Sequence, residues 1–177
     1  MVKLVKSGLM EQIYEILRER IINLELKPGE KVDVGSFAAE FDISETPIRD
    51  ALKKLSEEGL IKAKSRRGYY VVKLSKKDII EIYDLRKLLE SHALQSSIKN
   101  ISSSELQSLR RIWEEMRERE KERLVPPKFY STDQEFHWRI VKKCNNQRLQ
   151  VIFSQIYDLV RICQHMYMNI ENALDEH

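Results

Sequence analysis

The stretch from Ser44 to Gly68, SETPIRDALKKLSEEGLIKAKSRRG, decides the fold of the first part of this 177-residue chain. Apolar residues recur along it at i, i+3, i+4 and i+7, the spacing of one face of an α-helix: Ile48, Ala51, Leu52 and Leu55. The opposite face has polar groups able to meet phosphates and base edges, including Thr46 and Arg49. Gly59 supplies the left-handed residue that ends a helix. The stretch therefore predicts an amphipathic helix with a solvent-facing polar side.

A basic hairpin is predicted directly after this helix. Residues 60–72, LIKAKSRRGYYVV, alternate and are rich in Tyr and Val, with a turn at Arg66-Arg67-Gly68. No acidic residue lies between Gly59 and Lys77. A basic run alone is as compatible with a solvated surface as with nucleic-acid binding. Its position on a hairpin after a helix-turn-helix favours DNA binding.

The residues before Ser44 complete a winged helix-turn-helix. An apolar stripe predicts a first helix from Leu9 to Leu24, before the turn at Pro28-Gly29. Lys31-Val32 suits a short strand, and a short second helix follows over 35–41. Asp42 is expected in a left-handed conformation at the turn, and Ser44 or Thr46 is expected to cap the third helix. We assign residues 1–73 to this domain, with the helix-turn-helix from Val34 to Lys53.

The remaining residues, 74–177, predict an antiparallel helical bundle, so the chain is mainly α. No glycine occurs after Ser75. Ser75 and Asp78 form a capping box for a long helix through Ile98. Three further helices are expected over 102–124, 127–144 and 146–172.

Composition excludes several classes of protein. No apolar run is long enough to span a bilayer, and the N-terminus lacks the pattern of a signal peptide. Cys144 and Cys163 are too few and too distant for a disulfide scaffold. We therefore expect a cytoplasmic protein with two reduced thiols.

One pair of residues in the second half has the spacing of metal ligands. Asp133 and His137 lie four apart, so on a helix they share a face and can hold one cation. The alternative is that Asp133 pairs locally and that His137 is a hydrogen-bonded interior histidine.

The chain resembles the GntR family of bacterial transcription regulators, in its FadR-like branch with an all-α, FCD-type ligand-binding domain. The resemblance is carried by LELKPGEKV at 24–32, by SETPIRDALKKLSEEGLIKAKSRRGYYV at 44–71, and by IYDLRKLLESHAL at 82–94 with DQEFHWRIVKKCNNQRL at 133–149. It implies a DNA-binding regulator rather than an enzyme. The last bundle helices of the branch have no counterpart before His177, so the second domain is expected to be shortened.

The resemblance places the DNA contacts on the recognition helix and the wing. It implies that Thr46 and Arg49 hold the operator and that Arg67 and Gly68 form a wing tip in the minor groove. Lys53 and Arg66 are expected to be positioning contacts. Glu45 departs from the pattern, since many relatives have Arg there, and it either reads cytosine N4 or weakens binding. The predicted set is Ser44, Glu45, Thr46, Arg49, Lys53, Arg66, Arg67 and Gly68; the alternative for Arg49 is a surface pair with Glu45.

The resemblance also implies an effector site in the helical domain. Asp133, His137 and His177 match ligands of a divalent metal (Zn, Ni or Mn) that helps to hold a small carboxylate effector, with His165 as an alternative ligand. Arg86 matches the arginine expected to face the effector carboxylate, and its alternative is a helix pair with Glu90.

The expected function is sequence-specific DNA binding regulated by a small carboxylate. One recognition helix covers a half-site, so we expect a homodimer on a pseudo-palindromic operator. One alternative is an effector-blind DNA-binding dimer whose helical domain is purely structural. A second alternative is a metal-dependent hydrolase, although no base or nucleophile motif accompanies the metal residues.

Overall fold

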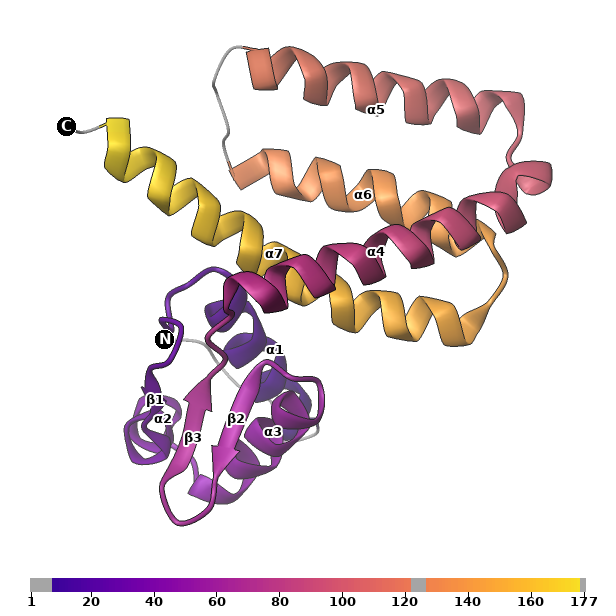
Figure 1. Cartoon of the computed structure of the whole chain (residues 1–177). Helices are drawn as coiled ribbons and strands as arrows, with labels where there is room; N and C mark the ends of the chain where they lie inside the picture. Colours follow the sequence, from indigo (N-terminus) through magenta and orange to yellow (C-terminus); the bar gives the residue numbers. More distant parts are fainter. Residues whose placement is uncertain (1–7, 122–126, 176–177) are drawn as a thin grey trace. The chain divides into compact units, whose positions relative to one another are not determined.

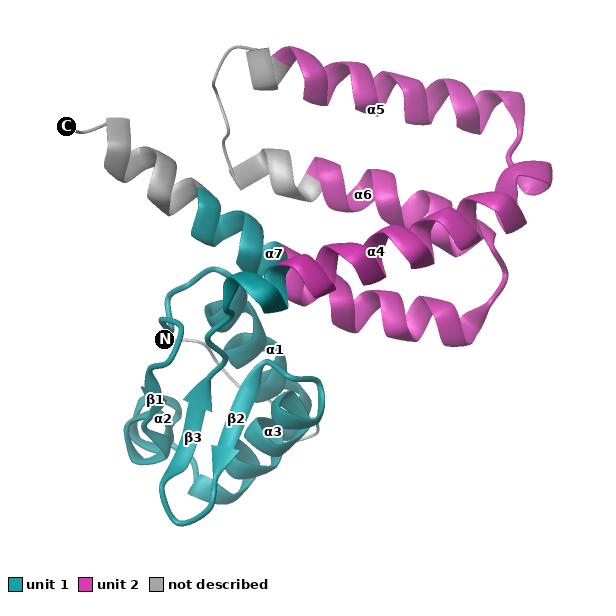
Figure 2. Ribbon diagram, in the orientation of Figure 1, with its two compact units in different colours: residues 1–79, 161–177 teal, residues 80–160 magenta. Residues whose placement is uncertain are grey.

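The computed structural model describes the backbone of residues 8–121 and 127–175, and side chains over 8–118 and 132–167. Packing divides the chain into two compact units (Figure 2): unit 1 is residues 1–79 with 161–177, and unit 2 is residues 80–160. The last helix, α7, contributes to both units. A division by packing therefore differs from one drawn along the sequence at residue 73. Within the described residues no helix combines the length and the apolar character needed to cross a bilayer.

Unit 1 contains a three-helix head with a small antiparallel sheet (Figure 1). Its helices are α1 (Leu9–Ile22), α2 (Val34–Phe41) and α3 (Glu45–Glu57). Its strands are β1 (Lys31–Val32), β2 (Ile61–Lys64) and β3 (Gly68–Val71), in the order β1-β3-β2. Lys64 pairs with Gly68 at the tip, so the hairpin turns where the sequence predicts. These elements are the winged helix-turn-helix expected from the sequence.

The head has a core made of hydrocarbon side chains. The predicted apolar face of α3 is completely buried, as are residues from α1. Burial of this kind stabilises a fold by about 25 cal/mol for each Å² of apolar surface removed from water. The fully buried members on these two helices are Ile13, Leu17, Ile21, Ile22, Ile48, Ala51, Leu52 and Leu55.

Local signals place the ends of the head helices. The Asp33 side chain accepts hydrogen bonds from the backbone N–H groups of Gly35 and Ser36, which caps α2. Asp42 has φ 53° and ψ 50°, the left-handed conformation expected at the turn. Ser44 occupies the N-cap position of α3 but its side chain makes no capping hydrogen bond. Gly59 ends α3 with φ 82°, and the Leu60 N–H then donates to the Leu55 carbonyl at 3.0 Å.

Unit 2 is built from α4 (Lys76–Ser97) after its first turn, a 3-10 turn (Ile98–Asn100), α5 (Ser103–Lys121), α6 (Pro127–Lys143) and the first part of α7 (Gln147–Asp175). The predicted capping box begins α4, because the Asp78 carboxylate accepts from the Ser75 N–H at 2.7 Å. One core cluster joins α4, α6 and α7: Ala93, Val141, Cys144, Leu149, Phe153 and Tyr157. Helix α5 packs on α6, where Arg139 donates to Ser108 Oγ at 2.8 Å.

The end of α7 belongs to unit 1, where it packs on α1. The Arg161 guanidinium donates to both carboxylate oxygens of Glu19, at 3.0 and 3.1 Å. Burial opposes the charge on Glu19, but the hydrogen bond and charge of Arg161 outweigh it and lower the pKa of Glu19. His165 Nδ1 lies 2.6 Å from the Ile22 carbonyl oxygen. His165, the alternative metal ligand, therefore belongs to a different unit from Asp133 and His137.

Candidate nucleic-acid interface and buried charge cluster

The outward face of α3 and the wing bring the predicted DNA-binding residues to the surface of unit 1. All eight are exposed: Ser44, Glu45, Thr46, Arg49, Lys53, Arg66, Arg67 and Gly68. They are exposed because the apolar side of α3 takes the core positions of the head. Two basic tip residues, Arg66 and Arg67, have no carboxylate partner in the part of the chain that the structure describes. The surface thus presents unneutralised positive charge to a phosphate backbone.

The wing tip depends on backbone conformations that few residues adopt. Arg66 has φ 57° and Gly68 has φ 99°. The Arg67 N–H donates to the Lys64 carbonyl at 3.0 Å, which closes the turn. A Cβ on Gly68 would lie 3.5 Å from Lys31 Cε, so the space is sufficient and the positive φ is what favours glycine. Lys64 is held over the Tyr70 ring with Nζ 4.3 Å from the ring centroid.

Arg49 is paired with Glu45 one turn earlier on α3. Arg49 Nη2 lies 2.7 Å from Glu45 Oε2, and about half of each side chain is exposed, 55% and 49%. This is the local pair considered as the alternative for Arg49. Exposed pairs of this kind contribute about 0–1 kcal/mol, so a phosphate or guanine can compete for the guanidinium. The pair is therefore compatible with a DNA-binding role.

Unit 2 contains a cluster of charged side chains drawn from α4, α6 and α7. His137 Nε2 lies 3.2 Å from Asp133 Oδ1, so the two predicted metal ligands do share a face. The other ring nitrogen, Nδ1, lies 3.0 Å from Glu90 Oε2. Arg86 Nε donates to Glu90 Oε1 at 2.8 Å, and Arg86 Nη2 lies 3.7 Å from Asp133 Oδ2. Tyr157 Oη donates to Asp133 Oδ2 at 2.6 Å.

The cluster keeps Asp133 ionised. Burial favours the neutral acid, but hydrogen bonds from His137 and Tyr157, with the charges of His137 and Arg86, lower the pKa of Asp133 to about 2. Burial together with the Asp133 carboxylate raises the pKa of Tyr157, so its phenol stays protonated and donates. Two carboxylates therefore stand against one permanent cation, Arg86, and one titratable ring, His137.

His137 is the titratable member of the cluster near neutral pH. Burial lowers its pKa, but hydrogen bonds to Asp133 and Glu90 outweigh burial and leave the pKa raised. Arg86 Nη2 also contacts His137 Nε2. A guanidinium can only donate, so that contact requires a lone pair on Nε2 and a proton on Nδ1, which donates to Glu90. Protonation of Nε2 would direct this N–H towards Asp133 instead.

The donor set suits a divalent metal in part. Asp133 and His137 converge, and Glu90 fixes the proton on Nδ1, which directs the Nε2 lone pair towards Asp133. Glu90 faces the opposite ring nitrogen and is not a third ligand of the same ion. Over the described residues no three His, Cys, Asp or Glu side chains form a group that could hold a metal. His177, the predicted third ligand, lies outside the described residues.

Two residues of the cluster, Glu90 and Tyr157, are absent from the predicted site. Glu90 had a local signal, because it lies four residues after Arg86 on one helix. Tyr157 had none, since it reaches Asp133 across 24 residues and from another helix.

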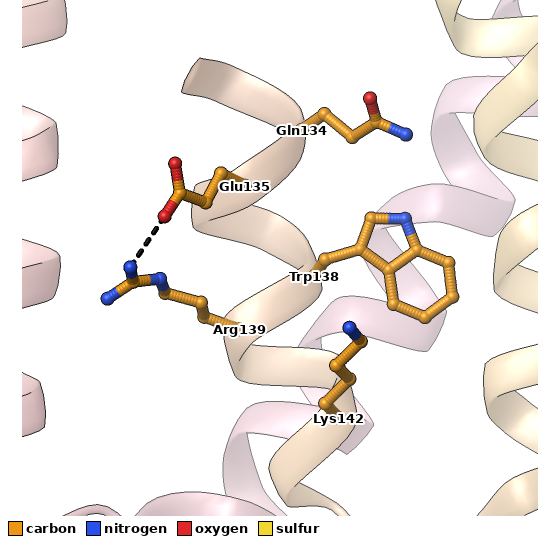
Figure 3. A pocket seen from close by; sticks show the side chains of 5 residues that line it. All are labelled: Gln134, Glu135, Trp138, Arg139 and Lys142. Atoms are coloured by element: carbon orange, nitrogen blue, oxygen red, sulfur yellow. Dashed lines mark hydrogen bonds and ion pairs between the residues drawn. The ribbon is translucent and has the colours of Figure 1, made fainter. Parts of the chain in front are cut away.

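Two hollows lie on α6. The first, about 460 Å³, is lined by α4 and α6 beside the cluster and includes Arg86, Glu90 and His137. The second, about 500 Å³, is lined by side chains of α6 alone among the described residues (Figure 3). There the guanidinium of Arg139 pairs with Glu135, and the Trp138 ring packs edge-on against Phe153, with ring centroids 5.4 Å apart. Only the first hollow has cationic and apolar groups from two helices around one space.

Comparisons with known proteins agree with this division. Residues 9–71 match the family described as bacterial regulatory proteins, gntR family, and residues 81–177 match the FCD domain. An HTH-type transcriptional regulator of Bacillus subtilis, YdhC, is 31% identical over 153 residues, which are 86% of this chain and 68% of that protein.

A second relative and a solved structure are similar in the same way. The gluconate operon transcriptional repressor of Bacillus subtilis is 32% identical over 140 residues, which are 79% of this chain and 57% of that protein. The structure of McbR/YncC from Escherichia coli has a TM-score of 0.71 at 20% identity, with 90% of this chain and 75% of that chain covered. That likeness shows a shared fold.

Proposed function

Because the chain belongs to the GntR family of bacterial regulatory proteins and is a DNA-binding transcription regulator with an FCD domain, we propose that it binds a pseudo-palindromic operator as a homodimer. A small carboxylate bound in the helical unit changes operator affinity. The family and the relatives are transcription regulators, which sets aside the alternative of a metal-dependent hydrolase. An operator on the chromosome implies a cytoplasmic location.

The observation that carries the DNA-binding site is the exposed polar face of α3 beside the basic wing. Arg49 has the planar fork that suits guanine or a pair of phosphate oxygens. Thr46, in the first turn of α3, lies where backbone N–H groups attract phosphate. Arg67 and Gly68 form the wing tip, which we propose enters the minor groove.

The experiment is selection of bound sequences from random duplex DNA, followed by titration of the selected operator. Arg49→Ala should weaken specific binding at least tenfold, since a bidentate base contact is worth about 1–3 kcal/mol. Lys64→Ala should weaken binding to every sequence and reduce the salt slope by about one. Lys99→Ala, an exposed lysine of the helical unit, is the matched control. Unchanged operator binding in both Arg49→Ala and Lys64→Ala would contradict this docking.

For the helical unit we propose one divalent metal (Zn, Ni or Mn) held by Asp133 and His137, with His177 as the third ligand. Support comes from the 3.2 Å approach of Asp133 Oδ1 to His137 Nε2. A bound cation would supply positive charge beside the first hollow. Arg86 and the metal need the same Nε2 lone pair, so Arg86 would turn away from His137 when the metal binds.

Metal content measured by mass spectrometry tests this proposal. Protein purified without chelator or affinity-tag metal should carry about one equivalent, and His137→Ala should carry none. Metal in neither protein would favour the alternative of an effector-blind dimer with a structural helical domain. The DNA-binding proposal is tested separately and would be unaffected.

A further inference from the structure

The first hollow, about 460 Å³, is built from one face of α4 and one face of α6. Its volume lies within the range of small-molecule sites. Four lining residues of α4 follow helical spacing at i, i+4, i+8 and i+11, and two residues of α6 lie at i and i+4. These six are Tyr83, Lys87, Ser91, Leu94, Phe136 and Ile140. Four of the six are apolar or aromatic, so most of the lining away from the charged cluster favours an apolar body.

Arg86 lines the same hollow, but its donors are already engaged. Its guanidinium donates to Glu90 at 2.8 Å and lies 3.7 Å from an Asp133 oxygen. It also lies over the Tyr157 ring, 5.5 Å from the centroid, and only 12% of its side chain is exposed. A ligand carboxylate would have to displace a carboxylate that Arg86 already holds. Arg86 is therefore better suited to positioning the cluster than to receiving a further anion.

Lys87 is the other cation that lines the hollow, and it is exposed. In the part of the chain that the structure describes, no carboxylate lies within ion-pair distance of its ammonium. Lysine is a compact charge on a flexible stem, which can follow a ligand without disturbing neighbouring contacts. Ser91, one turn later on the same face, adds a hydroxyl that can donate to the same anion.

We propose that this hollow binds a carboxylate with an apolar body, an aromatic ring or a short alkyl chain. Lys87 and Ser91 hold the carboxylate, and Tyr83, Phe136 and Ile140 surround the body. A polyhydroxylated acid fits poorly, because its hydroxyls would lie against apolar walls without partners. This proposal rests on the proposed effector response and names the ligand class, and it assigns the charged contact to Lys87 in place of Arg86.

Four probes test the class of ligand: benzoate, hexanoate, the neutral amide benzamide, and gluconate. Binding to the full chain is measured by isothermal titration calorimetry, and melting temperature is recorded in parallel. Benzoate and hexanoate should bind, whereas benzamide and gluconate should not. Lys87→Gln should weaken benzoate roughly tenfold, the loss expected for one charged hydrogen bond. Lys99→Gln removes the same charge from the exposed 3-10 turn and should leave benzoate binding unchanged.

Several results would overturn the proposal. Benzamide binding as tightly as benzoate would exclude recognition of the anion, and gluconate binding more tightly would exclude the apolar body. Benzoate binding that survives Lys87→Gln but is lost in Arg86→Lys would return the contact to Arg86. Loss of self-association in Lys87→Gln or Leu94→Ser would mean that a second copy of the chain covers the hollow. Operator titrations on the same preparations separate these failures from a failure of DNA binding.

Discussion

The head and the helical unit use their interiors in opposite ways. In the head, the inward side of α3 is hydrocarbon only, and every residue proposed to meet DNA lies on the outside. In unit 2, Asp133 is only 8% exposed, and the groups proposed to respond to a ligand lie among buried neighbours. A surface site can change its residues without cost to the fold. A buried charged site cannot, because each group is also part of the packing.

The largest effect expected from this comparison is on the head core. Leu52→Ala should lower the free energy of unfolding of the head by about 3–4 kcal/mol, because the cavity adds to the lost burial. Hydrogen exchange should show lost protection in α1 and α3 and little change in α6. Lys53→Ala, its exposed neighbour, should change stability by less than about 0.5 kcal/mol. Equal loss of protection in α6 would mean that the two units unfold together, which would break the comparison.

The next effect sharpens the contrast from the side of unit 2. Asp133→Asn keeps the shape of the side chain but leaves Arg86 and His137 without their shared carboxylate. We expect a loss of about 3 kcal/mol in the free energy of unfolding of unit 2, typical of a broken buried pair. Glu135→Gln, two residues away in an exposed pair with Arg139, should cost about 0.5 kcal/mol or less. Urea denaturation monitored through the tryptophans of unit 2 measures both, and equal effects would remove the special status of the cluster.

Sequence patterns predict the head well because its signals are local. The face of α3, the turn at Asp42 and the wing tip at Gly68 each depend on residues a few positions apart. The capping box of Ser75 and Asp78 is local as well.

The cluster in unit 2 depends on which faces three helices turn towards one another, and side-chain packing decides this. The spacing of Asp133 and His137 predicted that they share a face, but nothing in the sequence placed Tyr157 on the same carboxylate. The outward position of Trp113, which is 50% exposed, was likewise not readable from a helical stripe.

Proton binding should distinguish the two regions by a smaller amount. The pKa of Asp133 falls from 3.8 to about 2 on folding, so its contribution is present above about pH 4 and is lost as the pH falls towards 2. This difference corresponds to roughly 2 kcal/mol. The pKa of His137 is raised, so its contribution is present below its unfolded pKa of 6.5 and is lost as the pH rises through the folded value.

The stability of unit 2 should therefore be greatest between about pH 4 and 6.5. Urea denaturation at a series of pH values measures this profile. Asp133→Asn should flatten the acidic limb and His137→Gln the alkaline limb. An acidic limb that is unchanged in Asp133→Asn would assign it to other carboxylates.

The smallest expected effect concerns Glu45, where the surface site of the head borrows a feature of the buried one. Glu45 holds Arg49 at 2.7 Å, but in an exposed pair worth about 0.5 kcal/mol or less. Glu45→Gln should leave stability nearly unchanged and tighten operator binding a few-fold at low salt, because it frees Arg49 and removes a negative charge facing phosphate. The gain should shrink as salt is raised. If binding instead weakens only for operators with cytosine at one position, Glu45 reads that base through its N4 group. In that case the pair with Arg49 orients a reading residue, and the surface of the head is preorganised in the way that the interior of unit 2 is.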